Sequence, residues 1–444
     1  MPLQKLLKEK ETTAEVVAGW VKSGDILDYG MSIQQPDVFD VELAAQKDRL
    51  TDVTVRGTLS VAARQVIECD PEQKHFTFEN WHFSGYDRKK FSQGLESYVP
   101  FNFGEGPEIY RQYREVDMVV LKTTPMDEHG FFNFAASNTY ARAICDVAKR
   151  IVVETCTKMP LCYATEGTVH ISEVDAVIEG NNNPLFELPN APISDLDRTV
   201  ASHIVPLVKD GSCLQIGIGG MPNAVCSALA ESDIKDLGIH TEMFVDGMVD
   251  LVEAGKVTGW KKQTHRGKIT YTFALGTQRT YDFIHKNDTC LSLPVDETNL
   301  TQFIAANNNV VSINNCLQID LSGQVASESS GYRHISGTGG QLQFVRGAVQ
   351  SKGGLSFMCL SSRYTNSAGE PVSRIVPGIA PGTVVTTPRS DVMYVVTEFG
   401  IVNLKGKSVC ERARALISIA HPDDREMLHQ QACDNKMLSK KYWI

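Results

Sequence analysis

Short apolar runs alternate with longer amphipathic stretches along most of this chain. In residues 136–149 and 222–230, apolar positions recur with the spacing of a helix. The apolar runs between such stretches have the length of buried strands, and they are residues 118–121, 150–154, 214–218 and 394–397. This alternation predicts an α/β fold with largely parallel sheets covered by helices.

One segment of this pattern occurs twice. Residues 21–30 (VKSGDILDYG) align with residues 208–217 (VKDGSCLQIG), so that Gly24 lies over Gly211 at an offset of 187 residues. In each copy a helical pattern precedes the segment, and the chain turns at glycine into a short apolar strand. A single match of this length carries little weight, and a second one in the same order is needed.

The second match follows further along the chain. Residues 118–131 align with residues 311–324 at an offset of 193. The offset differs from the first by six residues, as a loop insertion between matched units would produce. We therefore expect two similar open α/β domains. Asn and Pro cluster without periodicity in residues 181–192, which places the boundary after residue 194 and gives domains of residues 1–194 and 195–444.

Composition excludes several classes of protein. The 444 residues are 42% hydrophobic and carry a net charge of -10, which argues against a protein that binds nucleic acid. No apolar run is long enough to cross a membrane, and the chain starts without the apolar core of a signal peptide, so we expect a cytoplasmic protein. The 11 Cys and 11 His form no metal-ligand spacing, and we expect no metal.

The richest candidate for chemistry is the glycine loop in residues 214–230. An apolar strand leads into Gly217, Gly219 and Gly220, and Pro222 suits the first turn of a following helix. Such a loop presents backbone N–H groups at a positive helix terminus and can hold a phosphate or an oxyanion. A tight strand-to-helix turn would need the same glycines, so the pattern alone leaves both interpretations open.

Two nucleotide motifs fit this chain poorly. Gly217 and Gly219 begin a G-x-G-x-x-G fingerprint, but its third glycine position is Pro222. Residues 406–408 (GKS) resemble the end of a P-loop, yet the required first glycine falls at Ile401. A dinucleotide-dependent oxidoreductase therefore stays a remote alternative.

Glu242 lies in an otherwise apolar run, residues 237–247. Glutamate is depleted in strands, and burying its charge is costly unless it is paired. From the spacing alone, an edge strand with Glu242 facing solvent is favoured. In a dinucleotide fold, an acid near this position would bind a ribose.

Two further polar segments are candidates. Residues 336–348 hold Gly337, Gly339 and Gly340 beside Gln341, which is either a second backbone-lined anion site or a flexible connection. Asn314, with its neighbour Asn315, either donates side-chain hydrogen bonds or forms a turn.

Four motifs in order make the chain recognisable. With GIGGMP at 217–222, HTEM at 240–243, GTGGQ at 337–341 and VVTEFGI at 395–401, the sequence resembles the acetyl-CoA hydrolase/transferase family of class I CoA-transferases over nearly its whole length. The resemblance implies two similar open α/β domains with the active site between them, and a catalytic glutamate at Glu242. It assigns CoA and oxyanion binding to two loops and one asparagine: Gly217, Gly219, Gly220, Met221, Pro222, Asn223, Asn314, Gly337, Gly339, Gly340 and Gln341.

The same resemblance implies a ping-pong transfer of CoA between a short-chain acyl-CoA and a carboxylate. The pattern around residues 28–30 and 82–88 favours a butyryl-CoA:acetate CoA-transferase, with a 4-hydroxybutyrate CoA-transferase or an acetyl-CoA hydrolase as alternatives. Coenzyme A would be a substrate and covalent intermediate, with no permanently bound cofactor. The family further implies a homo-oligomer. A non-catalytic ligand sensor would not require Glu242.

Overall fold

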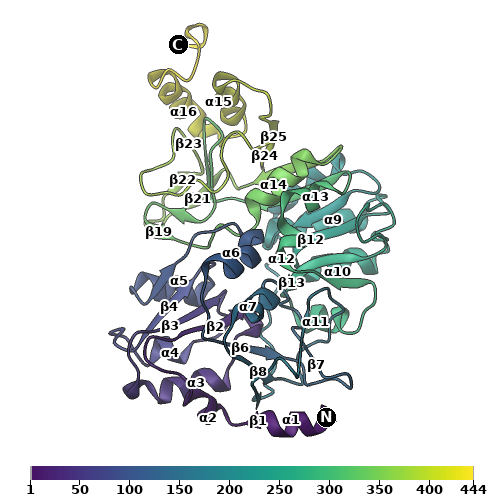
Figure 1. Ribbon diagram of the computed structural model, residues 1–444. Helices are drawn as coiled ribbons and strands as arrows, with labels where there is room; N and C mark the ends of the chain where they lie inside the picture. Colours follow the sequence, from purple (N-terminus) through teal and green to yellow (C-terminus); the bar gives the residue numbers. More distant parts are fainter. Residues whose placement is uncertain (1–2, 444) are drawn as a thin grey trace. The chain divides into compact units, whose positions relative to one another are not determined.

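The computed structural model describes residues 3–443, which form two compact units. The first unit contains the chain up to Leu188 with two later segments, Glu242–Phe244 and Thr270–Thr298. The second unit contains Pro189–Thr241, Val245–Ile269 and the chain from Asn299 onward. Figure 1 follows the chain through the elements of each unit.

The first large sheet has eight strands, and all its recorded pairings are parallel. Their order is β1 (Glu11–Thr12), β10 (Ala176–Glu179), β8 (Ile151–Thr155), β6 (Met118–Thr123), β2 (Ile26–Met31), β3 (Val53–Thr58), β4 (Phe76–Asn80) and β5 (Glu96–Tyr98). Helices connect the strands: α1 (Leu3–Lys10), α2 (Ala14–Ala18), α3 (Val38–Ala45), α4 (Gln65–Glu68), α5 (Gly85–Ser92), α6 (Gly106–Tyr113) and α7 (Ala141–Val147).

The second large sheet also has eight strands, and only β24 and β25 are recorded as antiparallel. Their order is β14 (Cys290–Ser292), β13 (Ile269–Ala274), β12 (Gly238–Phe244), β11 (Cys213–Ile216), β15 (Val310–Asn315), β20 (Leu355–Cys359), β24 (Tyr394–Thr397) and β25 (Gly400–Asn403). The helices are α8 (Asp195–Ile204), α9 (Gly220–Glu231), α10 (Asp246–Glu253), α11 (Gln278–Ile284), α12 (Val295–Asn299), α13 (Thr301–Ala305), α14 (Gln341–Gln350), α15 (Val409–Ser418) and α16 (Pro422–Asp434).

Small sheets of two or three strands accompany the large ones. They are β17 (Val325–Ala326), β16 (Gln318–Asp320) and β23 (Ile375–Val376); β18 (Ser329–Ser330) and β19 (Arg333–His334); β21 (Arg363–Thr365) and β22 (Pro371–Ser373); and β7 (Phe131–Asn133) and β9 (Thr168–His170). Together with the two large sheets, they confirm the α/β class predicted from the pattern. One predicted helix is shorter than expected: α7 begins only at Ala141, because Ala135 and Thr139 adopt left-handed backbone conformations that a helix cannot contain.

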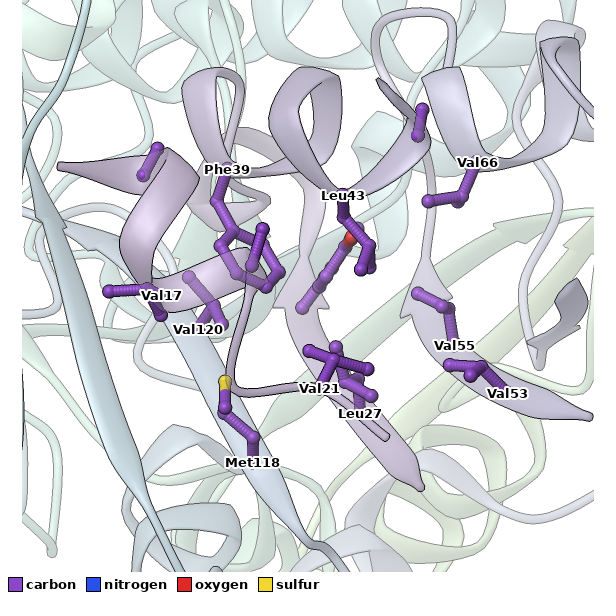
Figure 2. Close-up of a cluster of buried hydrophobic side chains, with 14 of the residues drawn as sticks. Val17, Val21, Leu27, Phe39, Leu43, Val53, Val55, Val66, Met118 and Val120 are labelled. Carbon is purple, nitrogen blue, oxygen red and sulfur yellow. The ribbon is translucent and has the colours of Figure 1, made fainter. Parts of the chain in front are cut away.

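Apolar side chains on one face of the first sheet pack against helices α2 and α3. Figure 2 shows Leu27 and Val55 from the strands facing Val17, Phe39 and Leu43 from the helices. All five are fully buried, and each such side chain typically stabilises the folded state by about 1.5–3 kcal/mol. The near-continuous apolar strands follow from a parallel sheet that is covered on its faces.

The two large sheets repeat the same topology. The first runs β10-β8-β6-β2-β3-β4-β5 and the second β24-β20-β15-β11-β12-β13-β14, which is the same order of strands along the chain. The register also repeats: Leu27 is the partner of Met118, and Leu214 is the partner of Val311. These are the residues that the sequence alignment superposed, so the predicted internal repeat is confirmed.

The repeat includes the turn after β6 and β15. Asp127 Oδ1 accepts the backbone N–H groups of the residues two and four positions later, both at 2.9 Å. Asp320 Oδ1 does the same at 2.9 and 3.0 Å. Gly130 and Gly323 have φ of 89° and 98°, which only glycine adopts readily. The two aligned Asp and Gly positions are therefore explained by one turn geometry.

The buried carboxylate of Glu154 holds the start of α3. Its oxygens accept the backbone N–H groups of Asp37, Val38 and Phe39 at 2.9–3.2 Å. We expect Glu154→Ala to lower the free energy of unfolding by about 3–5 kcal/mol, because three backbone donors, one buried and two half-buried, lose their acceptor. Glu154→Gln should cost less, since its amide oxygen keeps part of the contact. Urea unfolding measures both, and equal losses in the two variants would contradict this role.

A buried carboxyl pair makes the first unit sensitive to alkali. Burial, and next the neighbouring Asp87, raise the pKa of Glu96 to about 9. Asn80 Nδ2 donates to Glu96 Oε2 at 3.2 Å. Because the unfolded pKa is about 4.3, the folded state keeps a proton that the unfolded chain releases between pH ~4.3 and ~9, and stability falls as pH rises through that window.

Glu96→Gln should remove this dependence. At pH 5 we expect the variant to be close to the wild type in stability, whereas at pH 9 it should be more stable by about 5 kcal/mol, the linkage free energy of this pKa shift over that range. Thermal unfolding at both pH values measures the difference. The same decline in both proteins would show that other groups cause it.

Candidate active site

The glycine loop lies at the carboxyl end of β11, where ligands bind in parallel sheets. The Gly217 N–H donates to Ile313 O at 3.1 Å, which ends the strand. Gly219 then adopts φ 119° and ψ 176°, and α9 begins at Gly220. No side chain caps this helix, so its first backbone N–H groups are presented at a positive helix terminus.

The other members of this loop are fixed by packing. A side chain at Gly220 would lie 2.7 Å from Asp197 Oδ2 and 2.9 Å from Pro192 O, so only glycine fits there. Met221 and Pro222 are buried, with Pro222 in the first turn of α9 as expected. Their side chains are therefore largely taken up by the packing of α9.

Asn223, expected as a binding residue, has a structural contact. Its Nδ2 donates to Ala191 O at 3.2 Å and so ties α9 to the segment before α8. Its backbone N–H donates to Gly219 O at 3.1 Å, the first hydrogen bond of the helix.

Asn314 stands at the end of β15, beside the loop. Its Nδ2 donates to Ser312 Oγ at 2.8 Å and to Gln215 Oε1 at 3.3 Å, and Ser312 Oγ donates to the same Gln215 oxygen at 2.7 Å. Asn315 Nδ2 donates to Ile218 O at 3.2 Å. Both asparagines belong to the strand rather than to a turn. The sequence analysis missed Gln215 and Ser312, which become neighbours only through the pairing of β11 with β15.

The second glycine segment is the ordered start of α14. Gly339 has φ 55° and Gly340 precedes the helix, again without a side-chain cap. Gln341 Nε2 donates to Thr387 Oγ1 at 3.1 Å and lies 3.4 Å from Met358 Sδ in β20. Gly337 is buried. These contacts hold the segment near the carboxyl end of β20, where it forms a second glycine-preceded helix terminus.

Glu242 lies near the carboxyl end of β12, and its side chain is half-buried. β12 is flanked by β11 and β13, so the edge strand favoured from spacing alone is wrong. The apolar run around Glu242 belongs to an internal strand that is covered on its faces. The local sequence pattern does not distinguish such a strand from one at the edge of the sheet.

Two kinds of feature are absent from the described part of the chain. Between residues 3 and 443, no three His, Cys, Asp or Glu side chains are arranged to hold a metal ion. No helix in that part of the chain is long and apolar enough to cross a bilayer.

Two family models match this chain, one for each half. The acetyl-CoA hydrolase/transferase N-terminal domain matches residues 3–188, and the C-terminal domain of the same family matches residues 276–432. The chain belongs to the acetyl-CoA hydrolase/transferase family. This confirms the family resemblance and the expected enzyme class, a CoA-transferase.

Individual relatives of this family member match over nearly their full lengths. A butyryl-CoA:acetate CoA-transferase from Anaerostipes caccae is 44% identical, with 97% of this chain and 98% of the relative covered. A 4-hydroxybutyrate coenzyme A transferase from Clostridium kluyveri is 36% identical, with 96% and 98% covered. The crystal structure of RipA from Yersinia pestis has a TM-score of 0.91 and 38% identity, and 99% and 100% of the two chains are covered. These matches confirm the fold class.

Proposed function

We propose that this protein is a short-chain acyl-CoA:carboxylate CoA-transferase that uses butyryl-CoA and acetate. The observation that carries this proposal is the 44% identity to a butyryl-CoA:acetate CoA-transferase over 97% of the chain. The relative named for 4-hydroxybutyrate is less similar, at 36% identity. Coenzyme A acts as a substrate and covalent intermediate, with no permanently bound cofactor.

Glu242 is the nucleophile in this proposal. A carboxylate with a reference pKa of about 4.3 is ionised at neutral pH, so it needs no partner base. It attacks the thioester carbonyl of butyryl-CoA, and the C–S bond breaks to give an acyl-glutamyl anhydride and CoA thiolate. The thiolate then attacks the glutamyl carbonyl, butyrate leaves, and a glutamyl-CoA thioester remains. Acetate reverses these steps and departs as acetyl-CoA.

The two glycine-preceded helix starts provide electrostatic stabilisation. Each attack builds negative charge on a carbonyl oxygen, first on the substrate and then on the glutamyl group. One well-placed donor to such an oxygen contributes about 2.7–4 kcal/mol. The N–H groups around Gly219 and Gly220 and those around Gly339 and Gly340 supply donors at fixed positions, since neither helix carries a side-chain cap.

A chromatographic assay of acyl-CoA species tests the function. Purified protein with butyryl-CoA and acetate should yield acetyl-CoA, and omission of acetate should stop the reaction. If free CoA is released without acetate as fast as acetyl-CoA is formed with acetate, the protein acts as a hydrolase of the acetyl-CoA hydrolase type instead. Replacing butyryl-CoA with 4-hydroxybutyryl-CoA compares the donors, and a higher kcat/KM for the latter would overturn the preference proposed here.

A further inference from the structure

A cavity of about 400 Å³ opens within the second unit, beside the start of α9. Its volume lies in the range of small-molecule sites. Apolar atoms line part of it, from Met221, Cys316 and Leu360. Polar groups converge on the remainder, and the one that defines its chemistry is Arg374.

The Arg374 guanidinium is oriented from three sides. Its Nε donates to Ser361 Oγ at 3.0 Å and its Nη1 to Leu317 O at 3.0 Å. The guanidinium carbon lies 4.8 Å from the centre of the Tyr364 ring. Among residues 3–443 no carboxylate pairs with it, and its Nη2 makes no hydrogen bond within that range. A positioned arginine with unused donors is suited to an oxyanion.

Two other arginines of the second unit are already paired with carboxylates. Arg346 makes a two-bond contact with Asp391 at 3.1 and 3.2 Å. Arg363 donates to both oxygens of Asp424 at 2.6 and 2.7 Å. Arg374 lies beside a cavity and has no carboxylate partner among the described residues. In a chain of net charge -10, such an arginine is suited to an anionic ligand.

The same cavity carries an acceptor group, the carboxylate of Asp197. Its Oδ2 accepts from the Ser194 backbone N–H at 2.9 Å and from Ser194 Oγ at 2.7 Å. Its Oδ1 accepts no hydrogen bond from residues 3–443. A ligand that suits both groups carries an anion for Arg374 and an N–H or O–H donor for Asp197. Acetate and butyrate ions carry no donor.

We propose that this cavity binds a phosphate-bearing part of coenzyme A, with Arg374 contacting a phosphate and Asp197 accepting from an N–H or O–H group of the same molecule. Coenzyme A combines phosphates with amide and hydroxyl donors, whereas the carboxylate substrates do not. This inference rests on the proposed CoA-transferase function and adds the residue that recognises the phosphorylated part of its substrate.

Arg374→Met and Arg374→Lys test it with two donors, butyryl-CoA and butyryl-pantetheine, which lacks phosphate. We expect Arg374→Met to raise the KM for butyryl-CoA about ten- to a hundredfold, with the KM for acetate and the kcat/KM for butyryl-pantetheine unchanged. Arg374→Lys should show a smaller rise, because it keeps the charge without the planar fork. Arg266→Met is the matched control: Arg266 also lies over an aromatic ring, Trp260, and donates to a backbone oxygen, but it does not line the cavity.

Two kinetic results would overturn the proposal: an unchanged KM for butyryl-CoA, or an equal loss with both donors. Thermal unfolding verifies that the variants are folded. If Arg374→Met does not fold, the comparison is made with Arg374→Lys instead. Calorimetric titration with CoA and with pantetheine is independent of turnover. If the wild type binds CoA but transfers nothing, the proposed function is wrong, and the titration still tests the role of Arg374. Equal CoA affinity of the wild type and Arg374→Met would reject a role of Arg374 in binding CoA.

Discussion

Glu242→Gln should abolish CoA transfer, with kcat reduced by about four orders of magnitude or more. An amide is not a nucleophile toward a thioester, and the removal of a covalent nucleophile costs this much in other enzymes. Glu242→Asp keeps the charge but withdraws it by one methylene, and a displacement of about 1 Å costs roughly 10²-fold. Initial rates of acetyl-CoA formation from butyryl-CoA and acetate measure both variants.

The matched control is Glu179→Gln. Glu179 also ends a parallel strand, β10, but it is exposed and belongs to no proposed site. It should retain full activity. Turnover of Glu242→Gln within tenfold of the wild type would exclude Glu242 as the nucleophile.

The covalent intermediate can be trapped directly. Incubation with butyryl-CoA followed by borohydride should reduce the glutamyl-CoA thioester to an alcohol, and mass spectrometry of the peptide that contains Glu242 should detect it. An unmodified peptide from active protein, with a panel of short acyl-CoAs also tried, would reject the thioester.

Gly219→Ala should reduce kcat by about 10²–10³-fold, the range for the loss of one oxyanion donor. Gly219 has φ 119° and ψ 176°, a region that is essentially restricted to glycine and that costs other residues about 1–3 kcal/mol. An alanine Cβ would also lie 3.3 Å from Asn315 Nδ2. The loop would therefore shift, and the first N–H groups of α9 would move with it.

Gly255→Ala separates strain from catalysis. Gly255 also has a positive φ, 70°, but nothing lies within 4 Å of its added Cβ. Both variants should lose stability in thermal unfolding, and only Gly219→Ala should lose turnover in the acetyl-CoA assay. Full turnover in a folded Gly219→Ala protein would contradict the role of this loop as an oxyanion donor.

Much of the fold follows from local pattern. Strands β6, β8 and β24 agree with the apolar runs to within two residues at their ends, and α9 contains the predicted helix 222–230. The length of an apolar run and its spacing are local properties, which is why they could be read without a structure. The internal repeat was also recoverable, because both copies keep the Gly and Asp residues that their turns require.

The glycine loops were recognisable for a related reason. Gly219 and Gly339 have backbone conformations that restrict the choice of residue at their own positions. Glu242 was different: its local pattern favoured an edge strand, and only the resemblance to a family assigned it a role. The neighbours of β12 in the sheet are set by strands far away in the chain, so no local signal distinguishes an internal strand from an edge.

The α/β class, the duplicated units, the glycine loop before α9 and the family could all be inferred from the sequence. Tertiary structure alone decided which polar groups meet. Gln215 joins Ser312 through strand register across 97 residues, and Arg374 reaches Ser361 and Leu317 to line a cavity beside α9. The physical reason is that side-chain partners in a parallel sheet come from strands separated by whole helices, and their identity depends on packing that no short stretch of sequence encodes.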